Sequence, residues 1–177
     1  MDRVLLDACI LYPSVTRELL IGAAKQGFFT PLWSARILEE WRHTARRYGI
    51  GPVADIEIAL LRVGWPKAEV VPNEALEATL ALPDRNDRHV LAAAITGGAQ
   101  ELLTRNLKDF PTRVLARHQL VRREPDGFLL EMGDRLSPVV TVVYQRAQEM
   151  GGEAISCRRL LKRAGLPKLG KYFQALG

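Results

Sequence analysis

Short apolar runs of strand length recur along the first two thirds of the chain. Residues 3–6 and residues 101–104 are the clearest, and each leads into a polar residue, which predicts strands buried in a core. Residues 69–71 and residues 119–122 predict two further, brief strands. Residues 28–33 include a proline, which cannot donate to a sheet, so they predict a short connection between elements.

Amphipathic stretches lie between these runs. Their apolar residues recur three and four positions apart, which predicts helices. Ser34 and Asn73 are good N-cap residues for two of them, and Gly27 and Gly97 end two others. The predicted helices cover residues 14–26, 34–48, 52–63, 73–80 and 84–94.

The order of elements changes near residue 126. Before it, strands alternate with helices, which predicts an α/β fold with a mainly parallel central sheet. After it, three short helices are predicted over residues 138–150, 156–164 and 167–176. We therefore expect an α/β domain over residues 1–125 and a small helical C-terminal extension over residues 126–177 that packs on the core.

Composition excludes several classes of protein. The chain has 177 residues, of which 47% are apolar and 25% charged, so it has the balance of an ordinary globular protein rather than a disordered one. No apolar run approaches the roughly 20 residues of a membrane-spanning helix. Cys9 and Cys157 are far apart, and the N-terminus shows no export signal, so we expect a cytoplasmic protein with reduced thiols.

The net charge of +5 is concentrated in the tail. Residues 1–134 hold 17 Lys and Arg against 18 Asp and Glu, a balance of −1, whereas residues 135–177 hold 8 against 2, a balance of +6. A basic block favours a polyanionic partner such as nucleic acid, although it can also be a solvated surface or a docking site for an acidic protein segment. The cluster consists of Arg158, Arg159, Lys162 and Arg163, followed by Lys168 and Lys171.

Carboxylates stand at the ends of several predicted elements. In an open parallel sheet, ligands bind outside the carboxyl ends of the strands, where Asp7 and Asn106 are expected. The full set of candidates is Asp7, Glu39, Glu40, Asp84, Asp87, Asn106 and Asp109.

Each candidate also has a purely structural interpretation. Asp7 could cap the next helix, and Asp84 and Asp87 could be acids favoured at a helix N-terminus. Glu39 and Glu40 could be solvated helix charges, and Asn106 and Asp109 could form a turn. These interpretations do not explain why an acid ends the apolar run of residues 3–6.

Other chemistries lack their motifs. The three histidines are scattered, and no HExxH or paired Cys/His spacing appears. No serine stands in a GxSxG context, and no Gly-rich phosphate-binding loop is present. A phosphatase with a strand-end Asp-x-Asp would need an acid at position 9, where the chain has Cys9.

Four segments, taken in order, resemble a known family. They are residues 4–13 (VLLDACILYP), 33–42 (WSARILEEWR), 82–94 (LPDRNDRHVLAAA) and 102–111 (LLTRNLKDFP). Each is weak alone, but their order and spacing resemble the PIN domain and are most similar to the VapC-like ribonuclease toxins. The resemblance covers about residues 3–122. It implies a three-layer α/β/α fold, and the tail resembles the C-terminal extension of one PIN subgroup.

The resemblance also implies roles for individual residues. Asp7 matches the first acidic residue of the family, at the end of its first strand. Glu40 matches the helical glutamate six positions after the family serine, here Ser34, with Glu39 as the competing candidate one position away. Asp87 matches the aspartate that precedes a helix of small residues.

The fourth acidic position departs from the common pattern. Asn106 stands where many relatives carry an acid, which removes one potential charge. Asp109 is the nearby residue that could replace it, and Asp84 is a nearby auxiliary acid. The implied catalytic residues are Asp7, Glu40, Asp87, Asn106 and Asp109, and the implied metal ligands are Asp7, Glu40, Asp84, Asp87 and Asp109.

The family implies a metal-dependent endoribonuclease. Mg²⁺ and Mn²⁺ are hard cations that prefer oxygen ligands, which a cluster of carboxylates supplies. The expected substrate is RNA, cleaved to leave 5′-phosphate and 3′-hydroxyl ends, and the expected partners are a small antitoxin protein and a second copy of the chain. Two alternatives stay open: a catalytically weak PIN fold that binds RNA or forms complexes, and a nuclease for DNA or flaps.

Overall fold

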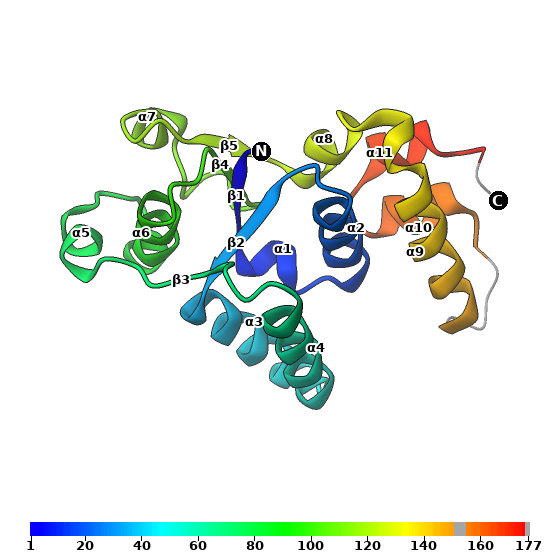
Figure 1. The fold of residues 1–177 in the computed structure, drawn as a ribbon, viewed down its shortest axis with the longest axis horizontal. Helices are drawn as coiled ribbons and strands as arrows, with labels where there is room; N and C mark the ends of the chain where they lie inside the picture. The colour runs from blue at the N-terminus through cyan, green and yellow to red at the C-terminus, as the bar shows by residue number, and fades with distance from the viewer. Residues whose placement is uncertain (151–154, 176–177) are drawn as a thin grey trace. The chain divides into compact units, whose positions relative to one another are not determined.

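The computed structural model describes residues 1–150 and 155–175, which fall into two compact units (Figure 1). The first, here called the sheet unit, comprises Met1–Tyr12 and Phe29–Arg123. The second, here called the helical unit, comprises Pro13–Phe28 and Glu124–Gly177. The predicted tail thus groups with residues 13–28, which come from the predicted first domain. Packing of the tail on the core stays a prediction.

A five-stranded sheet forms the centre of the sheet unit. Its order is β3-β2-β1-β4-β5, and every neighbouring pair is parallel. The apolar residues of β1 are completely buried, as the run at residues 3–6 predicts. This all-parallel sheet with its covering helices confirms the predicted α/β class and is consistent with a three-layer α/β/α fold. The strands are Arg3–Leu6 (β1), Thr30–Ser34 (β2), Glu69–Val70 (β3), Glu101–Leu103 (β4) and Val121–Arg123 (β5).

The prediction for residues 28–33 is wrong, because β2 contains Pro31. Along β2 the N–H groups alternate in direction: that of Thr30 donates to Asp2 on one side, and that of Trp33 donates to Ala68 on the other. The nitrogen of Pro31 therefore lies on the β3 side, where β3 pairs only with the last two residues of β2. The proline interrupts no hydrogen bond between strands.

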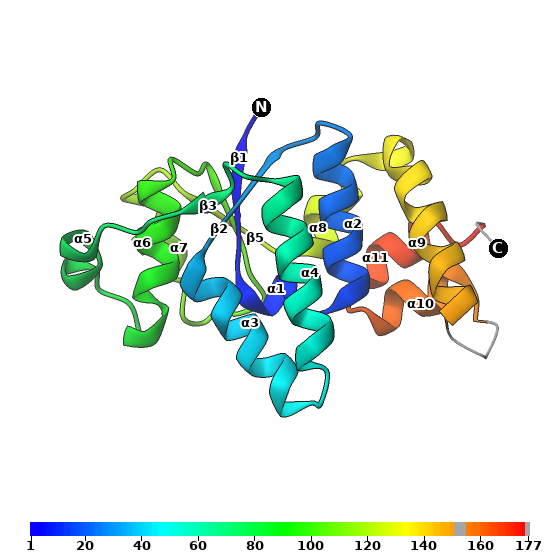
Figure 2. The same cartoon turned by 60° about the horizontal axis from the view of Figure 1, so that its bottom comes forward.

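Six helices belong to the sheet unit. Ser34 caps α3 and Asn73 caps α5, as predicted, by accepting hydrogen bonds from backbone N–H groups three residues later. Figure 2 shows α3 and α4 packed side by side. Within the sheet unit, α1 and α7 are absent from the prediction because four or five residues are too few to show helical periodicity. The helices are Ala8–Leu11 (α1), Ala35–Arg47 (α3), Gly51–Gly64 (α4), Glu74–Thr79 (α5), Arg88–Thr96 (α6) and Thr112–Ala116 (α7).

The helical unit joins α2 to the C-terminal helices. A Cβ added at Gly22 of α2 would lie 2.4 Å from Val139 Cγ1 of α9, so the missing side chain lets these helices pack closely. The three predicted tail helices are present as α9 to α11, although α11 ends at Tyr172 and the predicted end at Leu176 lies outside the described residues. The helices are Ser14–Lys25 (α2), Pro125–Leu130 (α8), Ser137–Met150 (α9), Cys157–Arg163 (α10) and Pro167–Tyr172 (α11).

Across the residues that the structure describes, no helix combines the length and the apolar character needed to cross a membrane.

Candidate active site

Asp7 and Thr104 lie side by side at the carboxyl edge of the sheet. Asp7 follows β1, Thr104 follows β4, and these strands pair with Leu6 opposite Leu103. One position further in this register, the Thr104 hydroxyl donates a hydrogen bond of 2.7 Å to Asp7 Oδ2. The strand register therefore sets the position of the first candidate acid.

The Asp7 carboxyl is buried and receives three hydrogen bonds. Its side chain caps α1, accepting from Ala8 N at 2.6 Å through Oδ1, and Cys9 Sγ lies 3.2 Å from the Oδ2 that Thr104 also contacts. Burial raises the pKa of Asp7 above its ordinary value; the three donors offset this only in part, and the charge of Glu40 raises the pKa further. The three hydrogen bonds therefore do not fully offset the unfavourable burial of the ionised Asp7 carboxylate.

Asp87 is the last residue of a 3-10 turn over Arg85–Asp87 and directly precedes α6. Its Oδ2 accepts a hydrogen bond of 3.0 Å from Asn106 Nδ2. Burial, together with the negative charge of neighbouring carboxylates, raises the pKa of Asp87 from 3.8 to about 6. Four neighbouring carboxylates contribute to this shift, and together with Asp87 we call them the acidic cluster; in order of effect they are Asp7, Asp84, Asp109 and Glu40.

The two adjacent glutamates of α3 have different surroundings. Glu40 Oε1 lies 2.8 Å from Nε2 of His89, a side chain on α6 that is 1% exposed. This is an ion-pair distance, although the ring N–H does not align for a hydrogen bond. Glu39 instead contacts Arg42, which also pairs with Asp55. Glu40 also lies 3.9 Å from Arg36, but its charge raises the pKa of both Asp7 and Asp87, so it belongs to the acidic cluster. The contacts of Glu39 are with a surface ion-pair network.

The remaining candidates combine structural and possible chemical roles. Asp84 is exposed and caps the 3-10 turn by accepting from Asn86 N at 2.8 Å, in line with its structural interpretation. Asp109 is mostly buried, with a side chain 14% exposed, and Lys108 Nζ lies 3.9 Å away. Asn106 forms a turn by donating its N–H to Thr104 Oγ1 at 3.0 Å, and its side chain reaches Asp87.

Two further residues hold Asp7 in place and were not predicted from the sequence. Thr104 and Cys9 both contact Asp7 Oδ2, and Cys9 Sγ also accepts from Arg105 N at 3.3 Å. Burial, together with the negative charge of Asp7, raises the pKa of Cys9 to about 12, so this thiol stays protonated. Thr104 could have been found from the sheet register, because it follows its strand as Asp7 follows the neighbouring one. Nothing in the sequence pattern indicates the contact of Cys9.

The oxygen atoms of the acidic cluster are of the type that hard divalent cations prefer as ligands. They belong to carboxylates, and repulsion among these groups contributes to the raised pKa of Asp87, so a bound cation would offset that repulsion. Within residues 1–150 and 155–175, no three His, Cys, Asp or Glu side chains are already gathered closely enough to enclose a metal ion. The residues that could hold one are Asp7, Glu40 and Asp87, with Asp84 and Asp109 nearby.

One known protein resembles a short part of this chain. It is named "Putative ribonuclease VapC50" and comes from Mycobacterium tuberculosis (strain ATCC 25618 / H37Rv). The two sequences are 48% identical over 48 residues, which is 27% of this chain and 28% of that protein. The match thus spans little more than a quarter of either protein. No solved structure matches the chain.

A family model covers much more of the chain. The model described as PIN domain matches residues 3–108, which include β1 to β4 and all the acidic positions discussed above except Asp109. The parallel sheet, with candidate acids at its carboxyl edge, agrees with this match. The chain belongs to the PIN-domain family.

Proposed function

We propose that this protein is a metal-dependent endoribonuclease that acts as the toxin of a toxin–antitoxin pair. The observation that carries the proposal is the acidic cluster around Asp87, whose pKa is raised to about 6 by burial and by four neighbouring carboxylates. Such mutual repulsion lowers the stability of the folded protein. Carboxyl groups with strongly perturbed pKa values are concentrated at functional sites.

Mg²⁺ or Mn²⁺ is the proposed cofactor, because PIN domains generally use divalent metal ions and the available ligands are carboxylates. Such an ion, when bound, would polarise a phosphodiester oxygen and lower the pKa of a bound water. Asp7, Glu40 and Asp87 are the proposed ligands. Asp84 and Asp109 contribute negative charge, and Asn106 holds Asp87 in place through its amide hydrogen bond.

RNA is the proposed substrate class. The matched relative is named as a ribonuclease, and its short match to this chain supports the same substrate here. The basic tail gives a second, independent reason to expect a polyanionic partner, since its 8 Lys and Arg face only 2 Asp and Glu.

A small antitoxin and a second copy of the chain are the proposed protein partners. An apolar stripe on α4 supports a protein partner, because exposed apolar patches mark interaction surfaces. Its four side chains recur three and four positions apart and are 54% to 80% exposed; they are Val53, Ile56, Leu60 and Val63. The proposed location is the cytoplasm, in keeping with two free cysteines.

Sequencing the 5′ ends of RNA in cells that express the protein tests this proposal. The wild type should produce new internal ends that carry a 5′-phosphate, and Asp87→Asn should not. Equal ends in both would contradict the proposal. Ends that are absent in both, with cleavage of DNA or flap substrates in a purified panel, would favour a DNA nuclease. Binding of RNA with no cleavage of any substrate would favour a catalytically weak RNA-binding module.

A further inference from the structure

The α10–α11 pair carries a dense group of positive charges, here called the basic face. Its six side chains are all exposed, and they are Arg158, Arg159, Lys162, Arg163, Lys168 and Lys171. Residues 155–175 contain no Asp or Glu. This concentration accounts for most of the excess charge of the tail.

The arrangement of α10 directs its cations away from the core. Cys157 and Leu161 are buried, at 0% and 1% exposure, and they define the inner side of the helix. At about 100° per residue, positions 158, 159, 162 and 163 fall on an arc of about 140° that begins about 60° from Leu161 and covers the side away from the two buried residues. Positions 158 and 162, and positions 159 and 163, are four apart and so neighbour each other on the surface.

A close approach of the two helices joins the cations of α11 to this arc. Gly170 of α11 lies against α10, where an added Cβ would be 2.9 Å from Arg158 O and 3.2 Å from Leu161 Cβ. The start of α11 is fixed by Asp126, whose carboxylate accepts from Lys168 N at 3.0 Å and from Leu169 N at 2.9 Å. The six cations therefore belong to one packed structure rather than to a loose tail.

Acidic side chains near the basic face do not neutralise it. Asp126 is engaged with backbone N–H groups of α11, and Asp134 accepts from the Tyr172 hydroxyl at 2.9 Å. None of the six cations forms an ion pair with any residue in 1–150 or 155–175; Arg158 contacts the amide oxygen of Gln174 at 3.2 Å. The charge of the basic face is thus available to a partner.

The chemistry of the basic face fits a nucleic-acid backbone better than a protein. Protein interfaces depend on buried apolar or aromatic anchors. Within residues 155–175 the only large apolar side chain among the exposed ones is Tyr172, and its hydroxyl is already bonded. A phosphodiester backbone needs no such anchor, because its affinity comes from neutralised phosphates and released counterions. Three of the six cations are arginines, which bind phosphate through two parallel hydrogen bonds.

We propose that the basic face of α10 and α11 is a binding site for the phosphate backbone of RNA. The choice of RNA rests on the proposed function; the choice of a phosphodiester backbone rests on the basic face itself.

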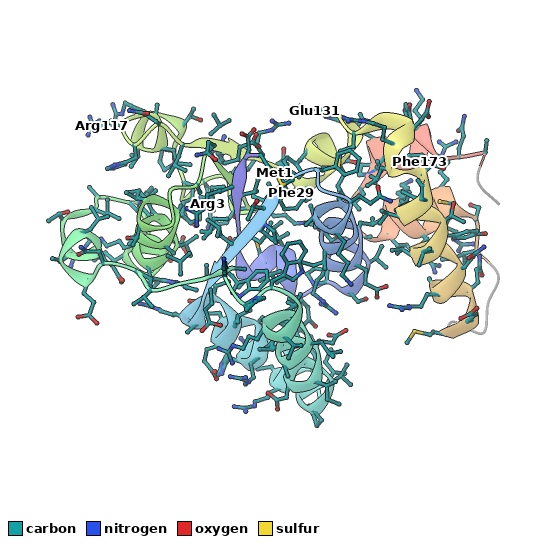
Figure 3. The ribbon with its side chains drawn as sticks, viewed as in Figure 1. Met1, Arg3, Phe29, Arg117, Glu131 and Phe173 are labelled. Carbon is teal, nitrogen blue, oxygen red and sulfur yellow. The ribbon has the colours of Figure 1, made fainter. Side chains whose placement is uncertain are left out.

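The test is RNA binding by the full chain under conditions that stop cleavage. All proteins carry Asp87→Asn, the buffer contains EDTA, and fluorescence anisotropy follows a labelled single-stranded RNA. Arg158→Ala with Lys162→Ala removes two cations of the basic face. The matched control is Arg113→Ala with Arg117→Ala, an exposed pair with the same spacing. Arg113 lies on α7, and Arg117, which Figure 3 labels, is the C-cap residue of that helix.

The expected result is weaker binding by the α10 variant and unchanged binding by the α7 control. In a plot of the logarithm of the binding constant against the logarithm of the salt concentration, each phosphate contact on a single strand contributes about 0.7 to the slope. Loss of two contacts should therefore reduce the slope by about 1.4. The affinity advantage of the parent over the α10 variant should then shrink by about sevenfold between about 50 and about 200 mM salt. Arg158→Lys with Lys162→Arg keeps the charges and should preserve the parent slope.

Three outcomes separate this inference from the proposed function. Equal affinity and slope in the α10 variant and the α7 control would overturn the basic face as an RNA site. So would binding of a labelled oligoglutamate peptide that depends on Arg158 and Lys162 while RNA binding does not. Loss of RNA binding in the α10 variant supports the inference even if the wild type never cleaves RNA, in which case the proposed function alone has failed.

Discussion

The two oxygens of Asp7 are held in different ways. Oδ1 accepts from the Ala8 N–H, as in any helix cap, whereas Oδ2 accepts from Thr104 and is also in contact with Cys9. A buried carboxylate with a fixed orientation suits a ligand that must keep its position when a cation or a phosphate arrives. Thr104 is therefore the residue that we expect to position Asp7.

Replacing Thr104 tests that role. Thr104→Val keeps the shape but removes the donor to Asp7 Oδ2, so RNA cleavage should fall by roughly 10- to 100-fold, as is typical for residues that orient a metal ligand. Thr104→Ser restores the hydroxyl and should restore most of the activity. Cleavage rates of the two variants under identical metal concentrations give the comparison, and a fully active Thr104→Val would show that Asp7 needs no such support.

The adjacent glutamates of α3 give a second comparison. Glu40→Gln should reduce cleavage by roughly 10- to 100-fold, because it removes a carboxylate of the cluster that includes Asp87. Glu39→Gln should leave cleavage near the wild-type rate, because Glu39 contacts Arg42 on the surface. Rates of both variants over a range of Mg²⁺ concentrations provide the measurement. A reversed order would mean that Glu39 is the ligand.

The raised pKa of Asp87 makes stability depend on pH in the absence of metal. Between 3.8 and about 6 the folded chain binds more protons at Asp87 than the unfolded chain does. The free energy of unfolding therefore falls as pH rises through this interval, and the destabilisation is complete above about pH 6. Metal binding should reverse it by favouring the ionised carboxylate.

Asp87→Asn removes this charge and should stabilise the metal-free protein. At about pH 7.5 we expect a gain of about 1 kcal/mol, a value reduced for solvent screening from the ~1.4 kcal/mol per pKa unit of linkage. At about pH 4 most of the gain should be lost, because Asp87 is then protonated in the folded chain and partly protonated in the unfolded chain. Urea unfolding in EDTA at the two pH values measures the difference. A variant less stable than the wild type at the higher pH would contradict the cluster as described.

Among the helices and strands, the sequence predicted the long amphipathic helices and the strands made of a continuous apolar run. The run at residues 3–6 is β1, and Ser34 and Asn73 cap the helices that they were expected to cap. The strand β2 was not predicted because it contains Pro31. A proline disrupts a strand only where a neighbouring strand needs its N–H, and β3 is too short to reach Pro31. The length of β3 cannot be predicted from residues 28–33.

The packing of α10 against α11 also gives a test at this scale. Gly170→Ala should lower the free energy of unfolding by about 1 to 3 kcal/mol, because the new Cβ would lie 2.9 Å from Arg158 O, a backbone atom that cannot move away easily. Gly127→Ala on α8 is the control: nothing lies within 4 Å of its added Cβ, and alanine favours a helix by up to about 1 kcal/mol. Urea unfolding of both variants gives the comparison, and equal stabilities would mean that the helices are not closely packed.

At the scale of the whole molecule, the candidate site depends on residues that are distant in sequence. The resemblance to PIN domains indicated Asp7, Glu40 and Asp87 as site residues, but it did not indicate which side chains contact them. Two such contacts join residues that are distant in sequence: Asn106 contacts Asp87, and His89 contacts Glu40. They depend on how helices and turns meet at the sheet edge, which no local sequence pattern predicts. Charge is also divided along the chain, with a balance of −1 over residues 1–134 and +6 over residues 135–177. We attribute catalysis to the acidic cluster and backbone binding to the basic face.

The most direct measurement is cleavage of RNA by the purified full chain with and without divalent metal. We predict internal cleavage with Mg²⁺ or Mn²⁺, leaving 5′-phosphate and 3′-hydroxyl ends, and no cleavage in EDTA. Asp87→Asn should be folded and inactive, whereas Glu39→Gln should cleave at the wild-type rate. Cleavage in EDTA, or wild-type cleavage by Asp87→Asn with metal supplied, would contradict a metal-dependent nuclease site at the acidic cluster.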